Sequence, residues 1–307
     1  MTEVLNREKI GILLGGSSSE REISLKSGEA VYNALKEEGL NVIKIDVVEK
    51  KAIEQFKESG ITLAFIAMHG GFGEDGRLQC ILEKLKIPYT GSGVKASQLA
   101  MDKVASRKIF VKKGINVPKY RLIVKNEKVE LNGFKFPLVV KPSSQGSSMG
   151  LTIVDKKDKL PDAVKSAFQF GDRVIVESYI EGREITVGIF NEEPLPIIEI
   201  IPKRRFFDFK AKYESGQTNY IVPADIKYDD FKTAQKIGLF SHRVLGCRDF
   251  SRVDMILSKE GRLFVLEVNT IPGLTKTSLL PKAANAVGID FSNLCKEMLK
   301  QATLRRI

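Results

Sequence analysis

Only three cysteines occur among the 307 residues, Cys80, Cys247 and Cys295, and no two of them form a CxxC pair. This odd, scattered set argues against a disulfide framework or a zinc site and favours free thiols in a reducing cytoplasm. Histidine is also scarce, with two residues. We find neither a Ser/His/Asp set nor a cysteine nucleophile with its base, so the sequence gives no support to nucleophilic catalysis of either kind.

Long apolar runs are missing as well. The longest, such as residues 64–68, fall far short of the roughly 20 residues that a membrane-spanning helix requires. The first nine residues carry charges of both signs and no apolar core, which is not the pattern of a secretory leader. We find no internal repeat and no low-complexity tract. We therefore expect no membrane partner.

The overall composition is that of a globular protein. Hydrophobic residues make up 43% of the chain and charged residues 28%, and the length predicts two or three packed domains. The formal net charge of +11 suits either nucleic acid or small anionic ligands. The densest basic group, Lys203-Arg204-Arg205, stands beside phenylalanines that could stack on bases. We favour an active-site loop that holds phosphates, and expect no nucleic-acid partner.

The N-terminal part alternates between strands and helices. Residues 9–14, 41–47 and 61–68 are predicted strands, and residues 21–38 are a predicted helix followed by Gly39. This alternation predicts a parallel sheet covered on both faces, and ligands bind at the carboxyl ends of such strands. Two glycine-rich loops stand there, at residues 15–20 and 69–76.

Further along, the pattern changes twice. Residues 97–113 are a predicted helix, and residues 136–141, 151–154, 158–168 and 174–179 add a compact strand and helix unit. From about residue 180 strands dominate, at 184–190, 195–200, 250–257 and 262–268. Helices are predicted at 230–245, 278–286 and 291–300.

One loop of small residues has the features of a phosphate site. A predicted strand ends at Lys141, and the sequence continues through Gly146, Ser147 and Ser148 to Gly150. Glycine and serine allow backbone N–H groups to approach phosphate oxygens, and the lysine adds a positive charge. It is not a Walker A loop, because GxxxxGK[ST] occurs nowhere in the chain. A plain hairpin loop remains the alternative.

A second group of polar residues falls on the last predicted hairpin. With an even turn, Asp254 lies opposite Val265 and Glu267 lies opposite Arg252, so that these side chains and Asn269 share one face. Three oxygen ligands beside an arginine predict a Mg²⁺ site next to an anion clamp. A one-residue shift in register would move Asp254 to the other face. The alternative is a charged, solvated face.

The loop at residues 71–76 fits GxGxxG after a strand, as in dinucleotide-binding folds. Its Glu74 and Asp75 would repel phosphates at a helix N-terminus, and no acidic residue follows at the usual distance, so we do not favour that interpretation. His69 ends a predicted strand beside the same loop, which favours a role in a site. His242 receives no role.

Together these segments resemble the ATP-grasp enzymes, and closely resemble the D-alanine:D-alanine ligase family. The likeness covers nearly the whole chain. Its markers, in order, are residues 14–24, His69-Gly70 with residues 73–76, residues 89–93, Met101-Asp102-Lys103, Lys141-Pro142 with residues 146–148, Arg252-Val253-Asp254, residues 267–270 and residues 272–275. Each is weak alone, but their order and spacing are highly specific.

The resemblance implies an ATP-grasp fold of α/β type with an N-terminal parallel-sheet domain. We expect domains at residues 1–92, 93–179 and 180–307, the last with the metal site and a mobile loop at 203–222. By resemblance, the ATP-binding residues are Lys103, Lys141 and Ser148 for the phosphates, Glu177, Ser178 and Ile180 for adenine, and Glu184 for ribose. Asp254, Glu267 and Asn269 are the expected ligands of two Mg²⁺ ions, with Mn²⁺ as an alternative.

The implied activity is the ATP-dependent joining of two D-alanines through an acyl phosphate, for peptidoglycan synthesis. The expected catalytic residues are Glu20, Ser147, Tyr213, Arg252 and Gly273. The expected substrate-binding residues are His69, Lys212, Ser278 and Leu279. The family implies a homodimer in the cytoplasm.

Relatives that make D-alanyl-D-lactate or D-alanyl-D-serine are the alternatives within the superfamily. A further alternative is a catalytically inactive relative that binds ATP for regulation. In this family a tyrosine at position 213 goes with dipeptide formation and a phenylalanine with D-lactate. Gln145 and Lys276 depart from the common pattern.

Overall fold

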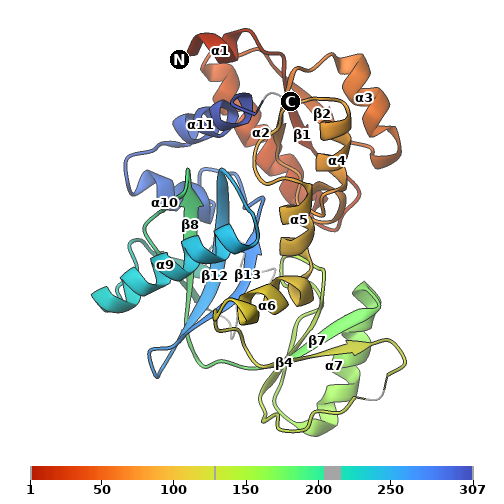
Figure 1. The fold of residues 1–307 in the computed structure, drawn as a ribbon, viewed down its shortest axis with the longest axis vertical. Helices are drawn as coiled ribbons and strands as arrows, with labels where there is room; N and C mark the ends of the chain where they lie inside the picture. Colours follow the sequence, from red (N-terminus) through yellow and green to blue (C-terminus); the bar gives the residue numbers. More distant parts are fainter. Residues whose placement is uncertain (1, 128, 204–215, 306–307) are drawn as a thin grey trace.

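The computed structural model describes residues 2–127, 129–203 and 216–305. These residues form three sheets stacked along the long axis of the molecule (Figure 1). The first is parallel, and the other two are antiparallel. No helix in the described ranges combines the length and the apolar character that crossing a membrane requires.

The first sheet has the predicted parallel form. Its strands are β1 (Ile10–Leu14), β2 (Val42–Asp46) and β3 (Leu63–Ile66), in the order β2-β1-β3. All of β1 and β3 is buried, as expected for strands covered on both faces. The surrounding helices are α1 (Thr2–Asn6), α2 (Arg21–Glu37), α3 (Ala52–Ser59) and α4 (Arg77–Lys84).

The C-terminal helix returns to this first sheet. Helix α11 (Phe291–Thr303) packs against α2 and β3, and its Leu294 and Met298 join the core of the N-terminal part. Both chain ends therefore lie in the same region of the molecule (Figure 1). The domain boundaries expected from the sequence stay a prediction.

The single helix predicted at residues 97–113 is wrong, because two helices occupy this stretch. They are α5 (Val94–Met101) and α6 (Lys103–Lys112), separated at Asp102, which has extended backbone angles. Its carboxylate accepts hydrogen bonds from the N–H groups of Val104 and Ala105, which is the usual role of aspartate at a helix start. The break places Lys103 at the first position of α6.

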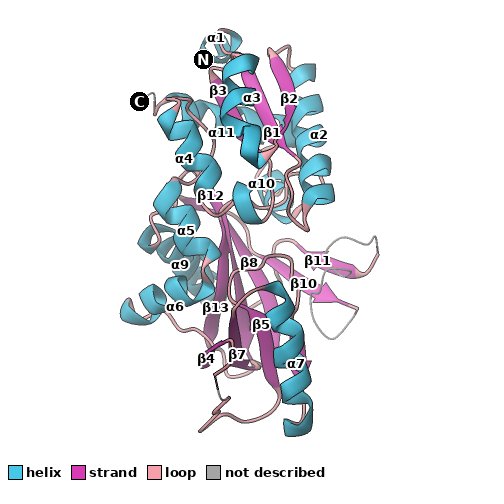
Figure 2. Cartoon of the chain, turned by 90° about the vertical axis from the view of Figure 1, so that its right-hand side faces the viewer, coloured by secondary structure: helices cyan, strands magenta, loops and turns pink. Residues whose placement is uncertain are grey.

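The second sheet has the order β4-β7-β5-β6, with strands β4 (Tyr120–Val124), β5 (Leu138–Pro142), β6 (Thr152–Val154) and β7 (Arg173–Ser178). Helix α7 (Leu160–Ala167) covers one face, where Leu138, Val140 and Val176 form the core. The other face turns toward the third sheet (Figure 2). Strand β4 was not predicted from the sequence.

The third sheet has the order β11-β10-β8-β12-β13. Its strands are β8 (Gly182–Phe190), β10 (Ile198–Pro202), β11 (Thr218–Ile221), β12 (Phe250–Ser258) and β13 (Leu263–Asn269), and the short β9 (Glu193–Pro194) pairs with β8. Helix α9 (Tyr228–Val244) packs on β8 and β12, and α10 (Leu279–Asn285) follows β13. The predicted strands here are confirmed, except that β11 was missed and β10 begins three residues later than expected.

Candidate active site

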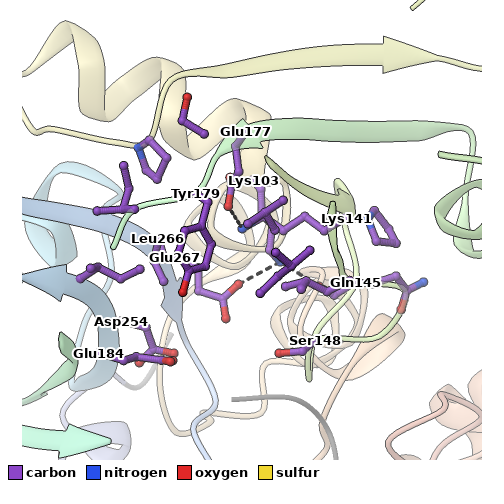
Figure 3. Close-up of a pocket in the computed structure, with 18 of the residues that line it drawn as sticks. Lys103, Lys141, Gln145, Ser148, Glu177, Tyr179, Glu184, Asp254, Leu266 and Glu267 are labelled. Atoms are coloured by element: carbon purple, nitrogen blue, oxygen red, sulfur yellow. Dashed lines mark hydrogen bonds and ion pairs between the residues drawn. The ribbon is translucent and has the colours of Figure 1, made fainter. Parts of the chain in front are cut away.

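Two cavities open beside β12 and β13. The first, the inter-sheet cavity, lies between the second and third sheets and is lined by residues of β5, β6, β7, β8, β12 and β13 (Figure 3). The second, the loop cavity, is lined by the start of α2, the loop after β3, the 146–147 turn and residues 269–279. Glu74 and Gly146 of the loop cavity and Lys103 and Glu267 of the inter-sheet cavity share a smaller space, so the two cavities are neighbours.

Most residues singled out in the sequence line these cavities. The inter-sheet cavity is lined by Lys103, Lys141, Ser148, Glu177, Ser178, Ile180, Glu184, Asp254 and Glu267. The loop cavity is lined by Glu20, His69, Ser147, Arg252, Asn269, Gly273, Ser278 and Leu279. Lys212 and Tyr213, with most of the expected loop at 203–222, lie outside the described residues.

The predicted pairing of the last hairpin is wrong. Asp254 pairs with Glu267, not Val265, and Arg252 pairs with Asn269, not Glu267. Near the turn, Leu257 pairs with Leu263, a register that would place Glu267 on the opposite face from Asp254. A β-bulge between Asp254 and Met255 inserts one extra residue in β13 and restores the shared face.

Arg252 neutralises the Asp254 carboxylate. Its Nε and Nη2 donate to the two carboxylate oxygens at 2.9 and 2.8 Å. The same carboxylate accepts hydrogen bonds from Thr186 Oγ1 at 2.6 Å and Asn269 Nδ2 at 3.0 Å. A buried carboxylate needs such partners, and Arg252 thereby holds its guanidinium at the border of the two cavities.

Lys103 and Lys141 are buried and paired in the same way (Figure 3). Lys103 Nζ lies 3.0 Å from Glu267 Oε2 and donates to the Gln145 carbonyl at 2.7 Å. Lys141 Nζ lies 2.9 Å from Glu177 Oε1. Burial lowers the pKa of Lys141, and the attraction of Glu177 offsets this only in part.

The oxygen donors around Asp254 fit a hard divalent cation. In the part of the chain that the structure describes, no group of three or more His, Cys, Asp or Glu side chains is placed to hold a metal. The available set is two carboxylates and one amide, Asp254, Glu267 and Asn269. Mg²⁺ commonly takes one or two carboxylates and completes its shell with water and substrate phosphates. Arg252 and Lys103, which pair with these carboxylates, supply the positive charge that such an ion would bring.

The loop after β5 lies between the two cavities and contributes residues to the lining of each. Ser147 and Ser148 have φ angles of 50° and 57°, in a left-handed region that side chains other than glycine rarely adopt and that clusters at functional sites. Ser148 faces the inter-sheet cavity and Ser147 the loop cavity. The side chain of Gln145, a departure noted in the sequence, donates to the Phe170 carbonyl at 3.2 Å.

The Ser147 hydroxyl donates to Glu20 Oε1. Glu20 precedes α2 and is 6% exposed, and its carboxylate faces the loop cavity. The Ser147–Glu20 contact therefore brings together two of the expected catalytic residues, which are 127 positions apart in the sequence.

His69 joins three segments of the loop cavity. Its Nδ1 lies 3.1 Å from the Ile271 carbonyl and its Nε2 lies 2.9 Å from Ser27 Oγ. A carbonyl only accepts, so Nδ1 carries the proton. Burial lowers the pKa of His69 to about 4, so Nε2 accepts from the Ser27 hydroxyl, which in turn accepts from the Leu274 N–H at 3.3 Å. The expectation that His69 lies near a substrate carboxylate stays a prediction.

Glu74 received no role from the sequence, although it stands in the family marker at residues 73–76, and it lines the loop cavity. Its Oε2 accepts the Gly70 N–H at 2.7 Å. Burial and the charge of Glu20 raise the pKa of Glu74 to about 8. Its place in a glycine-rich loop after a strand, and within the family marker at residues 73–76, were the two indications available. Thr186 and Arg107, which contact Asp254 and Glu177, stand in no motif and were missed.

Comparisons with known proteins agree over nearly the whole chain. The model of the D-ala D-ala ligase C-terminus matches residues 109–300, and that of the N-terminus matches residues 48–92. The D-alanine–D-alanine ligase of Syntrophotalea carbinolica is 44% identical over 302 residues, covering 98% of each chain. That of Pelotomaculum thermopropionicum is 45% identical over 307 residues, covering 96% of each.

Solved structures give the same result. The D-alanine–D-alanine ligase of Bacillus anthracis complexed with ATP superimposes with a TM-score of 0.86 at 38% identity, covering 97% of both chains. The VanG D-Ala:D-Ser ligase of Enterococcus faecalis gives 0.81 at 30% identity, covering 96% of this chain and 99% of that one. These likenesses confirm the expected α/β architecture, with an ATP-grasp fold and an N-terminal parallel sheet.

Proposed function

This chain belongs to the D-alanine–D-alanine ligase family, and on that premise we propose that it uses ATP and Mg²⁺ to join two D-alanines into D-alanyl-D-alanine for peptidoglycan precursor synthesis. One observation carries the proposal. A cavity with two buried lysines and the carboxylates of Asp254 and Glu267 adjoins a second cavity that is lined by the carboxylate of Glu20, by Arg252 and by Asn269.

The inter-sheet cavity has the chemistry of a nucleotide site. Val139, Ile153 and Leu266 offer apolar contacts to adenine, and Glu184 offers acceptors to the ribose. Lys103, Lys141 and Ser148 lie toward the phosphate end. Because both lysines are already buried, a phosphate that replaces their carboxylate partners meets charges that are only weakly screened.

Asp254, Glu267 and Asn269 are the residues that would hold Mg²⁺. The ion would offset the charge of the β- and γ-phosphates during transfer. The protein's own residues supply the rest of the electrostatics, because Arg252 and Lys103, which now pair with Asp254 and Glu267, are then free to face the substrate.

The first D-alanine belongs in the loop cavity. Glu20 binds its ammonium group, and the hydrogen bond from Ser147 fixes the direction of that carboxylate. The substrate carboxylate then points toward the inter-sheet cavity. One of its oxygens attacks the γ-phosphorus, the bond to the β-phosphate oxygen breaks, and ADP and D-alanyl phosphate result.

The second D-alanine reacts as a free amine. Its ammonium group first loses a proton to solvent, and the amine attacks the carbonyl carbon of the acyl phosphate. The nitrogen then gives up a second proton as the C–O bond to phosphate breaks and inorganic phosphate leaves. Arg252 and the Gly273 N–H stabilise the oxyanion that forms on the way. Ser278, at the start of α10, and the Leu279 N–H bind the carboxylate of this second substrate. The His69–Ser27–Leu274 chain of hydrogen bonds fixes the segment that carries Gly273.

The acyl phosphate must be kept from water. By the family resemblance, we assign that role to the segment of Lys212 and Tyr213, which lies outside the described residues. The end of the range expected from the sequence, Thr218–Ile221, is strand β11 of the third sheet. The family also favours a homodimer in the cytoplasm.

The experiment is product identification. The enzyme is incubated with ATP, Mg²⁺ and D-alanine, alone or with equal D-serine or D-lactate, with L-alanine as control, and the products are resolved by mass. D-alanyl-D-alanine as the main product in each D-alanine mixture supports the proposal. Preferential D-alanyl-D-serine would favour the second candidate, which the likeness to the VanG D-Ala:D-Ser ligase raises. Dependence on L-alanine alone would refute both.

A further inference from the structure

Arg107 is a charged side chain that the reaction as described does not use. It lies on α6, one helical turn after Lys103, and is 0% exposed. Its Nη1 lies 2.5 Å from Glu177 Oε2. The guanidinium also lies over the ring of Tyr120, 5.2 Å from the ring centroid, which is a favourable place for a cation.

The hydrogen bonds of Arg107 do not explain its presence. Among the residues that the structure describes, its Nε and Nη2 have no hydrogen-bond acceptor. Buried N–H groups without an acceptor are costly, and a charged group is costlier still. The benefit that offsets this cost is the positive charge of Arg107, which neutralises the buried carboxylate of Glu177.

Glu177 is shared between two cations. Its Oε2 faces Arg107, and its Oε1 lies 2.9 Å from Lys141 Nζ. Nucleotide phosphates require Lys141 to turn away from Glu177. If Lys141 were the only partner, that movement would leave a buried carboxylate without a counter-charge, which strongly disfavours it.

We propose that Arg107 is a positioning residue for nucleotide binding: as the permanent counter-ion of Glu177, it frees Lys141 to move from Glu177 to the nucleotide phosphates. The inference rests on the proposed function only in requiring that ATP binds in the inter-sheet cavity.

The neighbouring ion pair, Lys103 with Glu267, differs from the Lys141–Glu177 pair in what can replace its lysine. Lys103 is held by Glu267 at 3.0 Å and must also face the phosphates. Glu267 belongs to the candidate metal ligands, so a divalent ion can replace Lys103 as its partner. Glu177 is not one of the candidate metal ligands, so a divalent ion does not take the place of Lys141 there. Arg107, on the same helix as Lys103, stays as its partner.

The electrostatics agree with this division of roles. Burial alone would raise the pKa of Glu177, but the charges of Arg107 and then Lys141 outweigh it and hold this pKa below its ordinary value. For Lys141, burial and then repulsion from Arg107 act against the attraction of Glu177, and its pKa is lowered. Arg107 therefore stabilises the Glu177 carboxylate, and its repulsion of Lys141 opposes part of the attraction between Lys141 and Glu177.

The test compares a ligand with phosphates to one without. Calorimetry measures the affinity of the full-length protein for ATP with Mg²⁺ and for adenosine, in wild type, Arg107→Met, Arg107→Lys and the double variant Arg107→Met/Glu177→Gln. Lys108→Met is the matched control, because it removes one positive charge from an exposed position of the same helix. We expect Arg107→Met to weaken ATP binding at least tenfold while adenosine binding stays within twofold.

Arg107→Lys and the double variant separate the effect of charge from the effect of the arginine side chain itself. Arg107→Lys keeps the charge, and the double variant removes the carboxylate along with its counter-ion, so in both the ratio of ATP to adenosine affinity should lie within threefold of wild type. Equal weakening of both ligands by Arg107→Met would overturn the proposal, as would unchanged ATP binding. If Arg107→Met does not fold, the double variant decides: a tenfold loss in its ratio refutes the proposal. Absence of ATP binding in wild type would instead refute the proposed function.

Discussion

Asp254 and Glu267 lie directly opposite each other on β12 and β13, and they share a face only because a β-bulge interrupts the pairing next to them. The extra residue also leaves Leu266 and Glu267, which are consecutive, both lining the inter-sheet cavity. One extra residue in β13 thus places an apolar side chain beside a candidate metal-binding carboxylate in the same cavity.

If this pair holds the metal, removing one charge should stop the reaction without unfolding the protein. We expect Glu267→Gln to lower kcat at least about 100-fold, measured as D-alanine-dependent phosphate release. Glu260→Gln, in the exposed turn of the same hairpin, is the matched control and should leave the rate unchanged. A Glu267→Gln enzyme with more than a tenth of the wild-type rate would contradict the assignment of the metal ligands.

Gly146 leaves room for Glu20. A Cβ at position 146 would stand 2.7 Å from Glu20 Oε2, and Glu20 is held in place by Ser147. We expect Gly146→Ala to displace the Glu20 carboxylate and raise the KM for D-alanine roughly tenfold or more, because the ammonium contact is charge-assisted. The KM for ATP should change by less than about threefold. Equal changes in both constants would show that the loop as a whole, and not Glu20, is disturbed.

We expect His69 to make the free energy of unfolding fall as the pH is lowered. Burial depresses its pKa to about 4 in the folded protein, against about 6.5 when unfolded. The unfolded chain therefore binds the extra proton first, and stability is lost as the pH falls from 6.5 toward 4, by about 2 kcal/mol between pH 7 and pH 5. Urea unfolding of wild type and His69→Gln at both pH values checks this: the advantage of wild type should shrink by that amount on acidification. A difference that stays constant would refute the neutral, buried histidine.

We expect Glu74 to have the opposite effect, so that the free energy of unfolding falls as the pH is raised. Its pKa, raised to about 8 by burial and Glu20, means that the folded state holds a proton which the unfolded chain releases near pH 4.5. Stability is therefore lost as the pH rises from 4.5 toward 8, by about 4 kcal/mol. Glu74→Gln keeps a neutral side chain at every pH, so its stability relative to wild type should increase between pH 5 and pH 8. Thermal or urea unfolding that gives the same difference at both values would contradict this.

The sequence predicted the parallel sheet and the two glycine-rich loops. Every site residue expected from the sequence lines one of the two cavities, except Lys212 and Tyr213, which lie outside the described residues. The sheet follows from local periodicity and the loops from their glycines, whereas most of the site residues were implied by the family resemblance, which depends on the order of the motifs. It did not predict the bulge beside Asp254, because a strict period of two cannot show where one extra residue enters a strand.

The break at Asp102 was missed for a related reason. Apolar residues continue at helical spacing on both sides of it, and only the carboxylate's hydrogen bonds to Val104 and Ala105 end one helix and start the next. The contacts of Arg107 and Thr186 could not be predicted from the sequence, because each residue pairs with a partner about 70 positions away. Long-range pairing of single side chains leaves no local pattern.

In the proposed reaction, the γ-phosphoryl group passes to the carboxylate of the first D-alanine. This step is tested with D-alanine labelled with ¹⁸O in both carboxylate oxygens, by mass analysis of the released phosphate and of the dipeptide. We expect one ¹⁸O in each phosphate and one in the new peptide carbonyl, because the oxygen that attacks phosphorus leaves with it. Phosphate that carries no ¹⁸O, formed together with the dipeptide, would contradict the acyl phosphate and the roles given to both cavities.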